Sequence, residues 1–311
     1  MKLASNIIGR PVRVASISFT PGEQTLASIA RLVDQEGAHG VDIIALPETW
    51  NDQKKEQPET LEGPTVKTLA ELARKHRTYI VCPIDRMGDS GRLNSALLID
   101  RLGHIVMIYD KAYPYWSEFD RRPPVQVADF DVPVYETDFG NVGMAICFDV
   151  NFPEVWQRLA DQDAELVIWS SAYSGGRSLQ AHAINHHYYI VTSTYNRDCI
   201  VYDITGEEIL YECRDNGVNI SRFTLDLDRG IYHENFNVDK LNRLLAEHGD
   251  EVELEQWLHR EQWFVLRAKR PGICVRQLAR QYGLEELRAY KYRSQQEIDR
   301  MRKVTATAIS T

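Results

Sequence analysis

A cysteine stands where a predicted buried strand gives way to a turn. The apolar run 142–146 leads directly into Cys147, and the stretch 148–154 follows before a helical pattern begins. The N-terminal end of a helix favours negative charge and the thiolate is the nucleophilic form of cysteine, so this thiol is a candidate for covalent catalysis. The alternative is a small buried cysteine that only fills the core.

A carboxylate and an ammonium follow two other predicted strands. The mainly apolar predicted strand 41–46 is closely followed by Glu48, and the predicted strand 104–109 is closely followed by Lys111. Taken singly, the carboxylate could cap a turn and the ammonium could be a surface charge. Because ligands of α/β sheets bind at the carboxyl ends of strands, we expect acid, base and nucleophile to meet in one cleft.

Short runs rich in β-branched residues alternate with amphipathic helical patterns before residue 230. Such alternation predicts an α/β fold in which helices cover the sheets. The runs 93–100 and 104–109 are separated by Arg101-Leu102-Gly103, which predicts a hairpin and therefore a sheet of mixed direction. The predicted strands are 12–19, 41–46, 79–82, 93–100, 104–109, 132–137, 142–147, 165–170, 188–194, 200–202, 209–211 and 220–226.

The pattern changes near Gly230, beyond which the chain is polar and helical in pattern. We therefore divide the chain into a domain of residues 1–230 and a helical C-terminal extension of residues 231–311. Trp257 and Trp263 are bulky for exposed positions. We therefore expect the extension to pack on the domain or on a neighbouring subunit.

Bulk properties exclude several classes of protein. The formal charge of −9 argues against general nucleic-acid binding. The sequence also contains no run of about 20 apolar residues, the length needed to span a membrane. The five cysteines are an odd number without CxxC spacing, so neither a disulfide framework nor a thiolate metal site follows. The segment Met1–Asn6 lacks signal-peptide character. We therefore expect a cytoplasmic protein with no membrane or nucleic-acid partner.

The three candidate segments together resemble the nitrilase, or carbon–nitrogen hydrolase, superfamily. That family is marked by Glu, Lys and Cys in this chain order, here Glu48 in ALPETW, Lys111 in YDKAYPYWSE and Cys147 in GMAICFDVNFPE. The similarity extends from about Val12 to Asp226. It implies a four-layer α-β-β-α sandwich, a homodimer or higher homo-oligomer, and hydrolysis of a non-peptide C–N bond without cofactor or metal.

The resemblance also implies a role for each residue. Cys147 attacks an amide carbonyl to give a thioester, while Lys111 and the backbone N–H of Phe148 stabilise the oxyanion. Glu48 accepts the thiol proton, donates it to leaving ammonia or amine, and then activates water. Glu118, shortly after Lys111, matches a second glutamate that many members hold near the amide.

Departures from the family pattern narrow the expected substrate. Nitrile-cleaving members typically have Trp-Glu after the nucleophile, whereas this chain has Phe148-Asp149, which looks more like amidases and N-carbamoyl amidohydrolases. Asn151 stands where many of those enzymes have an arginine, so a substrate carboxylate is not expected there. Arg177 could supply a positive charge from a nearby loop or be a solvated loop residue. Phe148 and Tyr173 are the expected substrate-binding aromatics.

Three other functions stay open at the level of sequence. A nitrilase would use the same residues on a nitrile. A catalytically idle member would bind or assemble without turnover, although intact Glu48, Lys111 and Cys147 weigh against it. A metallohydrolase could use His182 and His186, which share a helix face. No glutamate lies between them as in HExxH and no third ligand is evident, so hydrogen-bonded structural histidines are favoured.

Overall fold

The computed structural model describes residues 7–50, 58–89 and 91–309, with side chains described up to Lys303. Met1–Asn6, the segment without signal-peptide character, lies outside the described residues. The chain forms two compact units, one of Val12–Leu225 and one of Asp226–Thr311 together with the residues up to Pro11. Within the described ranges, every helix is too short or too polar to cross a lipid bilayer.

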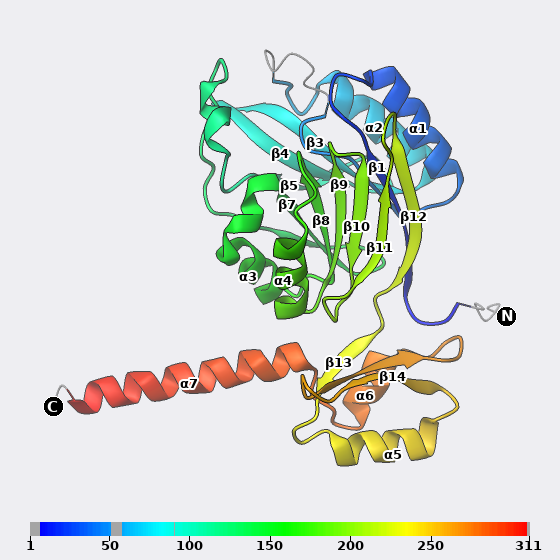
Figure 1. The fold of residues 1–311 in the computed structure, drawn as a ribbon, viewed down its shortest axis with the longest axis vertical. Helices are drawn as coiled ribbons and strands as arrows, with labels where there is room; N and C mark the ends of the chain where they lie inside the picture. The colour runs from blue at the N-terminus through cyan, green and yellow to red at the C-terminus, as the bar shows by residue number, and fades with distance from the viewer. Residues whose placement is uncertain (1–6, 51–57, 90, 310–311) are drawn as a thin grey trace. The chain divides into compact units, whose positions relative to one another are not determined.

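Two six-stranded mixed sheets lie at the centre of the larger unit (Figure 1). The first sheet contains, in spatial order, β12 (Asn219–Asp226), β1 (Pro11–Ser18), β2 (Ile43–Ala45), β3 (Tyr79–Gly88), β4 (Gly91–Ile99) and β5 (Ile105–Asp110). The second sheet contains β11 (Glu208–Cys213), β10 (Asp198–Tyr202), β9 (Tyr189–Thr194), β8 (Leu166–Ser171), β7 (Asn141–Ile146) and β6 (Val134–Glu136). Every strand predicted from the sequence is present, with ends shifted by a few residues.

Strand direction within each sheet follows the connections. β1, β2 and β3 run parallel because helices join them, whereas β3, β4 and β5 are antiparallel neighbours joined by short turns. The predicted hairpin is confirmed, since Leu98 pairs with Met107 across β4 and β5. β5 therefore runs in the same direction as β2, and both strands end at the same edge of the sheet.

Helices cover the outer face of each sheet, which confirms the four-layer α-β-β-α order (Figure 1). The helices are α1 (Leu26–Ala38) and α2 (Pro64–His76) on the first sheet, and α3 (Pro153–Asp161) and α4 (Arg177–His186) on the second. Thr25 caps α1 by accepting the backbone N–H of Ser28. Leu159 of α3 occupies the space that a Cβ on Gly143 of β7 would need, so the glycine lets helix and sheet approach closely.

Buried hydroxyl groups tie the two sheets together. Ser16 of β1 donates to the carbonyl oxygen of Thr192 at 2.7 Å. Ser170, near the end of β8, donates to the carbonyl oxygen of Leu46 at 2.8 Å. Buried hydroxyls need partners, and the second of these bonds anchors the backbone two residues before Glu48.

The C-terminal unit has a hydrophobic core of its own. Its helices are α5 (Val238–His248), α6 (Val275–Gln281) and α7 (Leu287–Ile309), in a part of the chain whose sequence is helical in pattern. It also contains an antiparallel sheet that the sequence analysis missed, ordered β13 (Gly230–His233), β15 (Trp263–Ala268) and β14 (Val252–Leu258). A bulge between Leu254 and Gln256 interrupts the alternation of β14, which hides the strand pattern. Trp257 packs against Phe264 in this core, so its bulk is accommodated within the unit.

Candidate active site

Glu48 lies just beyond the carboxyl end of β2, and only 5% of its surface is exposed. Thr49 has a φ of +33°, a strained value for a β-branched residue, and the chain turns sharply there. Tyr195, which follows β9 of the other sheet, donates its hydroxyl to the carbonyl oxygen of Glu48 and lies 3.2 Å from Thr49 Oγ1. The backbone that carries Glu48 is therefore held from both sheets.

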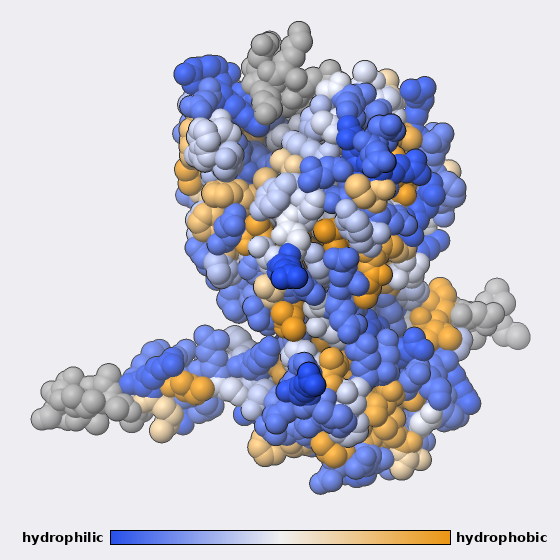
Figure 2. Space-filling model, viewed as in Figure 1, coloured by the Kyte–Doolittle hydropathy of each residue, from blue (hydrophilic) through white to orange (hydrophobic). Residues whose placement is uncertain are grey.

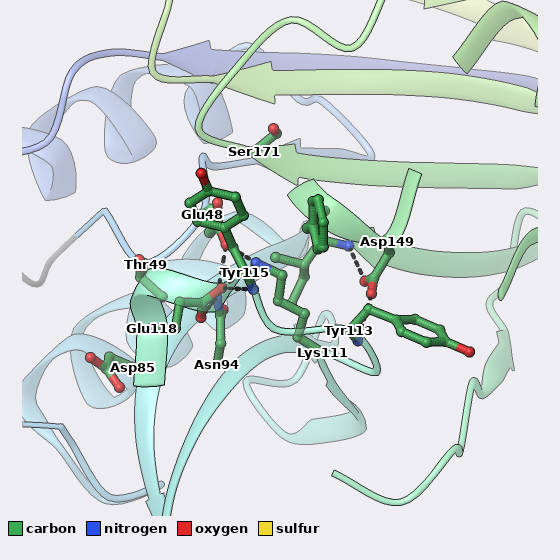
Figure 3. A network of polar contacts seen from close by, with 12 residues as sticks. Glu48, Thr49, Asp85, Asn94, Lys111, Tyr113, Tyr115, Glu118, Asp149 and Ser171 are labelled. Atoms are coloured by element: carbon green, nitrogen blue, oxygen red, sulfur yellow. Dashed lines mark hydrogen bonds and ion pairs between the residues drawn. The ribbon is translucent and has the colours of Figure 1, made fainter. Parts of the chain in front are cut away.

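Glu48 belongs to a buried network of four side chains (Figure 3). Lys111, directly after β5, donates from Nζ to Glu48 Oε1 at 2.8 Å and to Glu118 Oε1 at 2.6 Å. Asn94 of β4 donates from Nδ2 to Glu48 Oε1 at 2.8 Å and to Glu118 Oε2 at 2.9 Å. The structure thus brings together three of the expected site residues and adds a fourth side chain, Asn94.

The charges in this network support one another. Burial alone would lower the pKa of Lys111, but the carboxylates of Glu48 and Glu118 outweigh burial and raise it, so Lys111 stays an ammonium. Burial acts to raise the pKa of Glu118, yet Lys111 and the hydrogen bonds to the carboxylate lower it, so Glu118 stays a carboxylate. A fixed ammonium in a dry site is a strong stabiliser of a developing oxyanion.

Two 3₁₀ turns carry Glu118 and Cys147. Glu118 lies in η1 (Trp116–Asp120), where its Oε1 also accepts the backbone N–H of Tyr115 at 2.8 Å. Cys147 opens η2 (Cys147–Asn151), directly after β7. Both turns follow strands, so the sheets determine the positions of the backbone atoms that carry these two side chains.

Asp149 holds the segment after Lys111 against the turn that follows β7. Its Oδ2 accepts the Tyr109 hydroxyl at 2.7 Å and the backbone N–H of Ile146 at 2.9 Å, while Oδ1 accepts the backbone N–H of Tyr113 at 3.1 Å. Burial raises the pKa of Asp149 to about 6, against the opposing effects of Lys111 and these hydrogen bonds. The aspartate of the Phe-Asp pair therefore joins the two chain segments of the site.

Cys147 follows β7 as expected, but its thiol differs from the expectation. Its φ of +42° is left-handed, a conformation that costs a non-glycine residue about 1–3 kcal/mol and recurs at functional sites. Burial raises the pKa of the thiol to about 12; the negative charge of Glu48 adds to this effect and Lys111 opposes it. Burial and the charge of Glu48 therefore disfavour the thiolate that the sequence pattern predicted. The thiol therefore needs a base to remove its proton, and Glu48 is close enough for its charge to affect the pKa of Cys147.

The expected substrate-binding aromatics are Phe148, next to Cys147 in the chain, and Tyr173, just beyond β8. Phe148 is partly buried and packs edge-on against Tyr115, with ring centroids 5.3 Å apart. Tyr173 is 39% exposed, and its partial burial raises its pKa. Arg177, the other cationic candidate, is exposed at the start of α4.

The histidines of α4 have partners that account for their positions. His182 stacks on Trp156, with ring centroids 4.3 Å apart, and its Nε2 lies 2.8 Å from the carbonyl oxygen of Val150. His186 stacks on His182 at 6.2 Å. Within the described part of the chain, no group of three or more His, Cys, Asp or Glu side chains is placed to hold a metal ion. The geometry therefore favours structural histidines.

Sequence reasoning missed Asn94 and did not identify Tyr195 as a residue that holds the backbone of Glu48. One signal for Asn94 was present: it interrupts the apolar run of β4, and a buried polar side chain needs partners. Nothing in the sequence identified those partners, because Glu48 and Glu118 are brought to Asn94 only by the pairing of strands.

The chain belongs to the carbon-nitrogen hydrolase family, whose profile matches residues 13–230. Members of this family, also called the nitrilase superfamily, are enzymes that hydrolyse non-peptide C–N bonds. The match covers nearly all of the larger unit, including the 3₁₀ turns η1 and η2.

Individual relatives agree with this membership. The chain is 28% identical over 208 residues to deaminated glutathione amidase of Synechocystis sp., covering 58% of this chain and 76% of that protein. It is 23% identical over 287 residues to N-carbamoylputrescine amidase of Arabidopsis thaliana, covering 85% and 94%. Among solved structures, the amidase from Nesterenkonia sp. AN1 in complex with acrylamide has a TM-score of 0.60 at 18% identity, covering 69% and 91%. That likeness shows the same fold.

Proposed function

We propose that this enzyme cleaves the C–N bond of a small amide or N-carbamoyl compound through a thioester on Cys147. The observation that carries the proposal is the buried ammonium of Lys111, held 2.8 Å from Glu48 and 2.6 Å from Glu118 within electrostatic reach of a strand-end thiol. A base, an oxyanion stabiliser and a nucleophile then surround one point, as acyl transfer requires.

In the first step, Glu48 takes the proton of the Cys147 thiol while the sulfur forms a bond to the amide carbonyl carbon. The carbonyl oxygen becomes an oxyanion, which Lys111 and the backbone N–H of Phe148 stabilise. Glu48 then gives the proton to the departing nitrogen, the C–N bond breaks, and ammonia or an amine leaves. The acyl or carbamoyl group stays on sulfur as a thioester or thiocarbamate.

In the second step, water replaces the departed nitrogen. Glu48 takes a proton from that water, the oxygen bonds to the carbonyl carbon, and the C–S bond breaks. The sulfur leaves with the proton from Glu48, so the thiol and the carboxylate are both restored. Glu118 stays ionised throughout, because its three hydrogen bonds favour the carboxylate.

A panel of substrates tests the proposed reaction. Simple amides should release ammonia alone, and N-carbamoyl amines should release ammonia together with carbon dioxide. N-carbamoyl amino acids should react more slowly, because Asn151 replaces the arginine that could hold a carboxylate. Nitriles should show no ammonia release, since the chain carries Phe148-Asp149 after the nucleophile. Turnover of nitriles but not of amides would replace this proposal with the nitrilase alternative.

We also infer that two copies of the chain associate through α7. Leu287 at its start is buried, whereas Ile298 and Met301 are 51% and 55% exposed and lie three residues apart. Figure 2 shows the surface of this helix as largely hydrophilic, interrupted by hydrophobic side chains.

The helix α7 carries six Lys and Arg against two Asp and Glu. Residues 231–311 hold 14 Lys and Arg against 12 Asp and Glu, a formal charge of +2. Because the whole chain carries −9, residues 1–230 carry −11. A second copy therefore offers a complementary acidic surface.

Deleting residues 294–311 should lower the oligomeric mass measured by light scattering at micromolar concentration. Ile298→Glu should weaken association, because it places a charge in the apolar part of the contact. Gln296→Ala, at an exposed position of the same helix, serves as the control. An unchanged mass after the deletion would remove α7 from the interface.

A cytoplasmic location is a further inference. All five cysteines are free in the structure, three of them buried and two exposed. Exposed free thiols are typical of proteins kept in a reducing compartment. Fractionation of the source cells would test this inference.

A further inference from the structure

Asn94 makes two hydrogen bonds that link the two carboxylates of the site. Its Nδ2 lies 2.8 Å from Glu48 Oε1 and 2.9 Å from Glu118 Oε2, and the residue is 1% exposed. Carboxylates only accept hydrogen bonds, so the NH₂ end of the amide must face both of them. The Asn94 Oδ1 atom then points elsewhere and has no partner in the described structure.

Burying the polar amide of Asn94 costs free energy that an apolar side chain would not. The protein therefore accepts an unfavourable group at this position in order to present an amide NH₂ to two carboxylates. An apolar residue would avoid this cost, and β4 carries apolar residues from Ala96 to Ile99. This imbalance indicates that the two hydrogen bonds serve the chemistry of the site.

The two glutamates differ in how many of their carboxylate oxygens accept hydrogen bonds. Glu48 Oε1 accepts hydrogen bonds from both Lys111 Nζ and Asn94 Nδ2. Within the described ranges, no group donates a hydrogen bond to Glu48 Oε2. Both oxygens of Glu118 accept hydrogen bonds. Oε1 accepts from Lys111 Nζ and the backbone N–H of Tyr115, and Oε2 accepts from Asn94 Nδ2. One carboxylate therefore has a free oxygen able to take a proton, and the other has none.

We propose that Asn94 is a positioning residue that fixes Glu48 through Oε1, so that Oε2 is the oxygen that takes and returns the proton. The same amide group saturates Glu118 and keeps it out of proton transfer. This inference rests on the proposed function, since it assigns a base within that mechanism. Without Asn94, the Glu48 carboxylate can rotate about its last bond and Glu118 has an oxygen free to compete for the proton.

The test is Asn94→Leu, which keeps a similar volume and removes the NH₂ group. We expect kcat to fall by about 10- to 100-fold, the range for losing hydrogen bonds to charged groups, while KM changes by less than about threefold. Alkylation of Cys147 by iodoacetamide at neutral pH should slow in parallel, because the thiol loses a well-positioned base. Asn94→Asp, with the same shape but an added negative charge, should reduce kcat further.

Asn219→Leu is the matched control. Asn219 is a buried strand asparagine whose Nδ2 donates to Ser221 Oγ at 3.0 Å and to the carbonyl oxygen of Glu212 at 3.4 Å. It lies on β12, separated from β4 by three strands of the same sheet, a distance of about 19 Å at the usual strand spacing. This control should lose comparable thermal stability and keep its kcat and its alkylation rate.

The outcomes separate this inference from the proposed function. A folded Asn94→Leu protein with wild-type kcat, or a loss confined to KM, would overturn the positioning role while leaving the mechanism intact. Hydrolysis that survives Cys147→Ala would instead overturn the mechanism itself. Should Asn94→Leu fail to fold, Asn94→Ser, which retains a single hydroxyl donor, is measured against the same criteria.

Discussion

Replacing Cys147 with alanine should reduce turnover of every accepted substrate by at least about 10⁴-fold, the scale seen when a covalent nucleophile is removed. The fold should persist, because the change removes one sulfur atom from a residue that is 8% exposed. The measurement is ammonia release by wild-type and variant enzymes at matched concentration, together with their thermal unfolding.

Chemical labelling provides the control for this prediction. Cys213 and Cys274 are the exposed thiols, so iodoacetamide should also react there, particularly because burial raises the pKa of Cys147. Loss of activity should nevertheless follow modification of Cys147 alone, as read by peptide mass spectrometry. Cys213→Ala should be fully active. Activity that disappears on labelling of Cys213 while Cys147 is unmodified would contradict the assignment.

Replacing Lys111 with alanine should lower kcat by roughly 100-fold or more, on the scale of losing an oxyanion donor. It should also destabilise the fold by about 3–5 kcal/mol, because the carboxylates of Glu48 and Glu118 are then buried without a cation. Chemical denaturation and initial rates measure the two effects separately. Lys75→Ala removes an exposed ion pair to Asp34, and should leave activity unchanged and cost at most about 1 kcal/mol.

A double variant separates the catalytic from the structural effect of Lys111. Lys111→Ala combined with Glu118→Gln removes one cation and one carboxylate charge, so much of the lost stability should return. The rate should stay low, because no ammonium faces the oxyanion. Recovery of the rate together with stability would mean that Lys111 acts only by balancing buried charge.

The strand ends that carry the site were largely predictable from the sequence. The runs before Glu48, Lys111 and Cys147 are mainly apolar and end at clear turns, so each side chain could be assigned to the end of a strand. The order of the four layers followed from the family resemblance. Sequence pattern works here because the strands are buried and their periodicity is regular.

Other features were not predictable because they depend on contacts distant in sequence. The pairing of β4 beside β3 and β5 brings Asn94 to Glu48 and Glu118, and no local pattern encodes that meeting. Burial and the nearby charge of Glu48 raise the pKa of Cys147, and both arise from residues distant in sequence. The bulge in β14 concealed a strand in the C-terminal unit.

The covalent role of Cys147 beside Glu48 and Lys111 is tested most directly by trapping the acyl-enzyme. The enzyme is mixed with a hydrolysed amide, quenched in acid within one turnover, and digested for mass spectrometry. The peptide that contains Cys147 should carry the mass of the acyl group, and hydroxylamine should remove it. Single-turnover product formation without any adduct, or with the acyl group on another residue, would contradict the account.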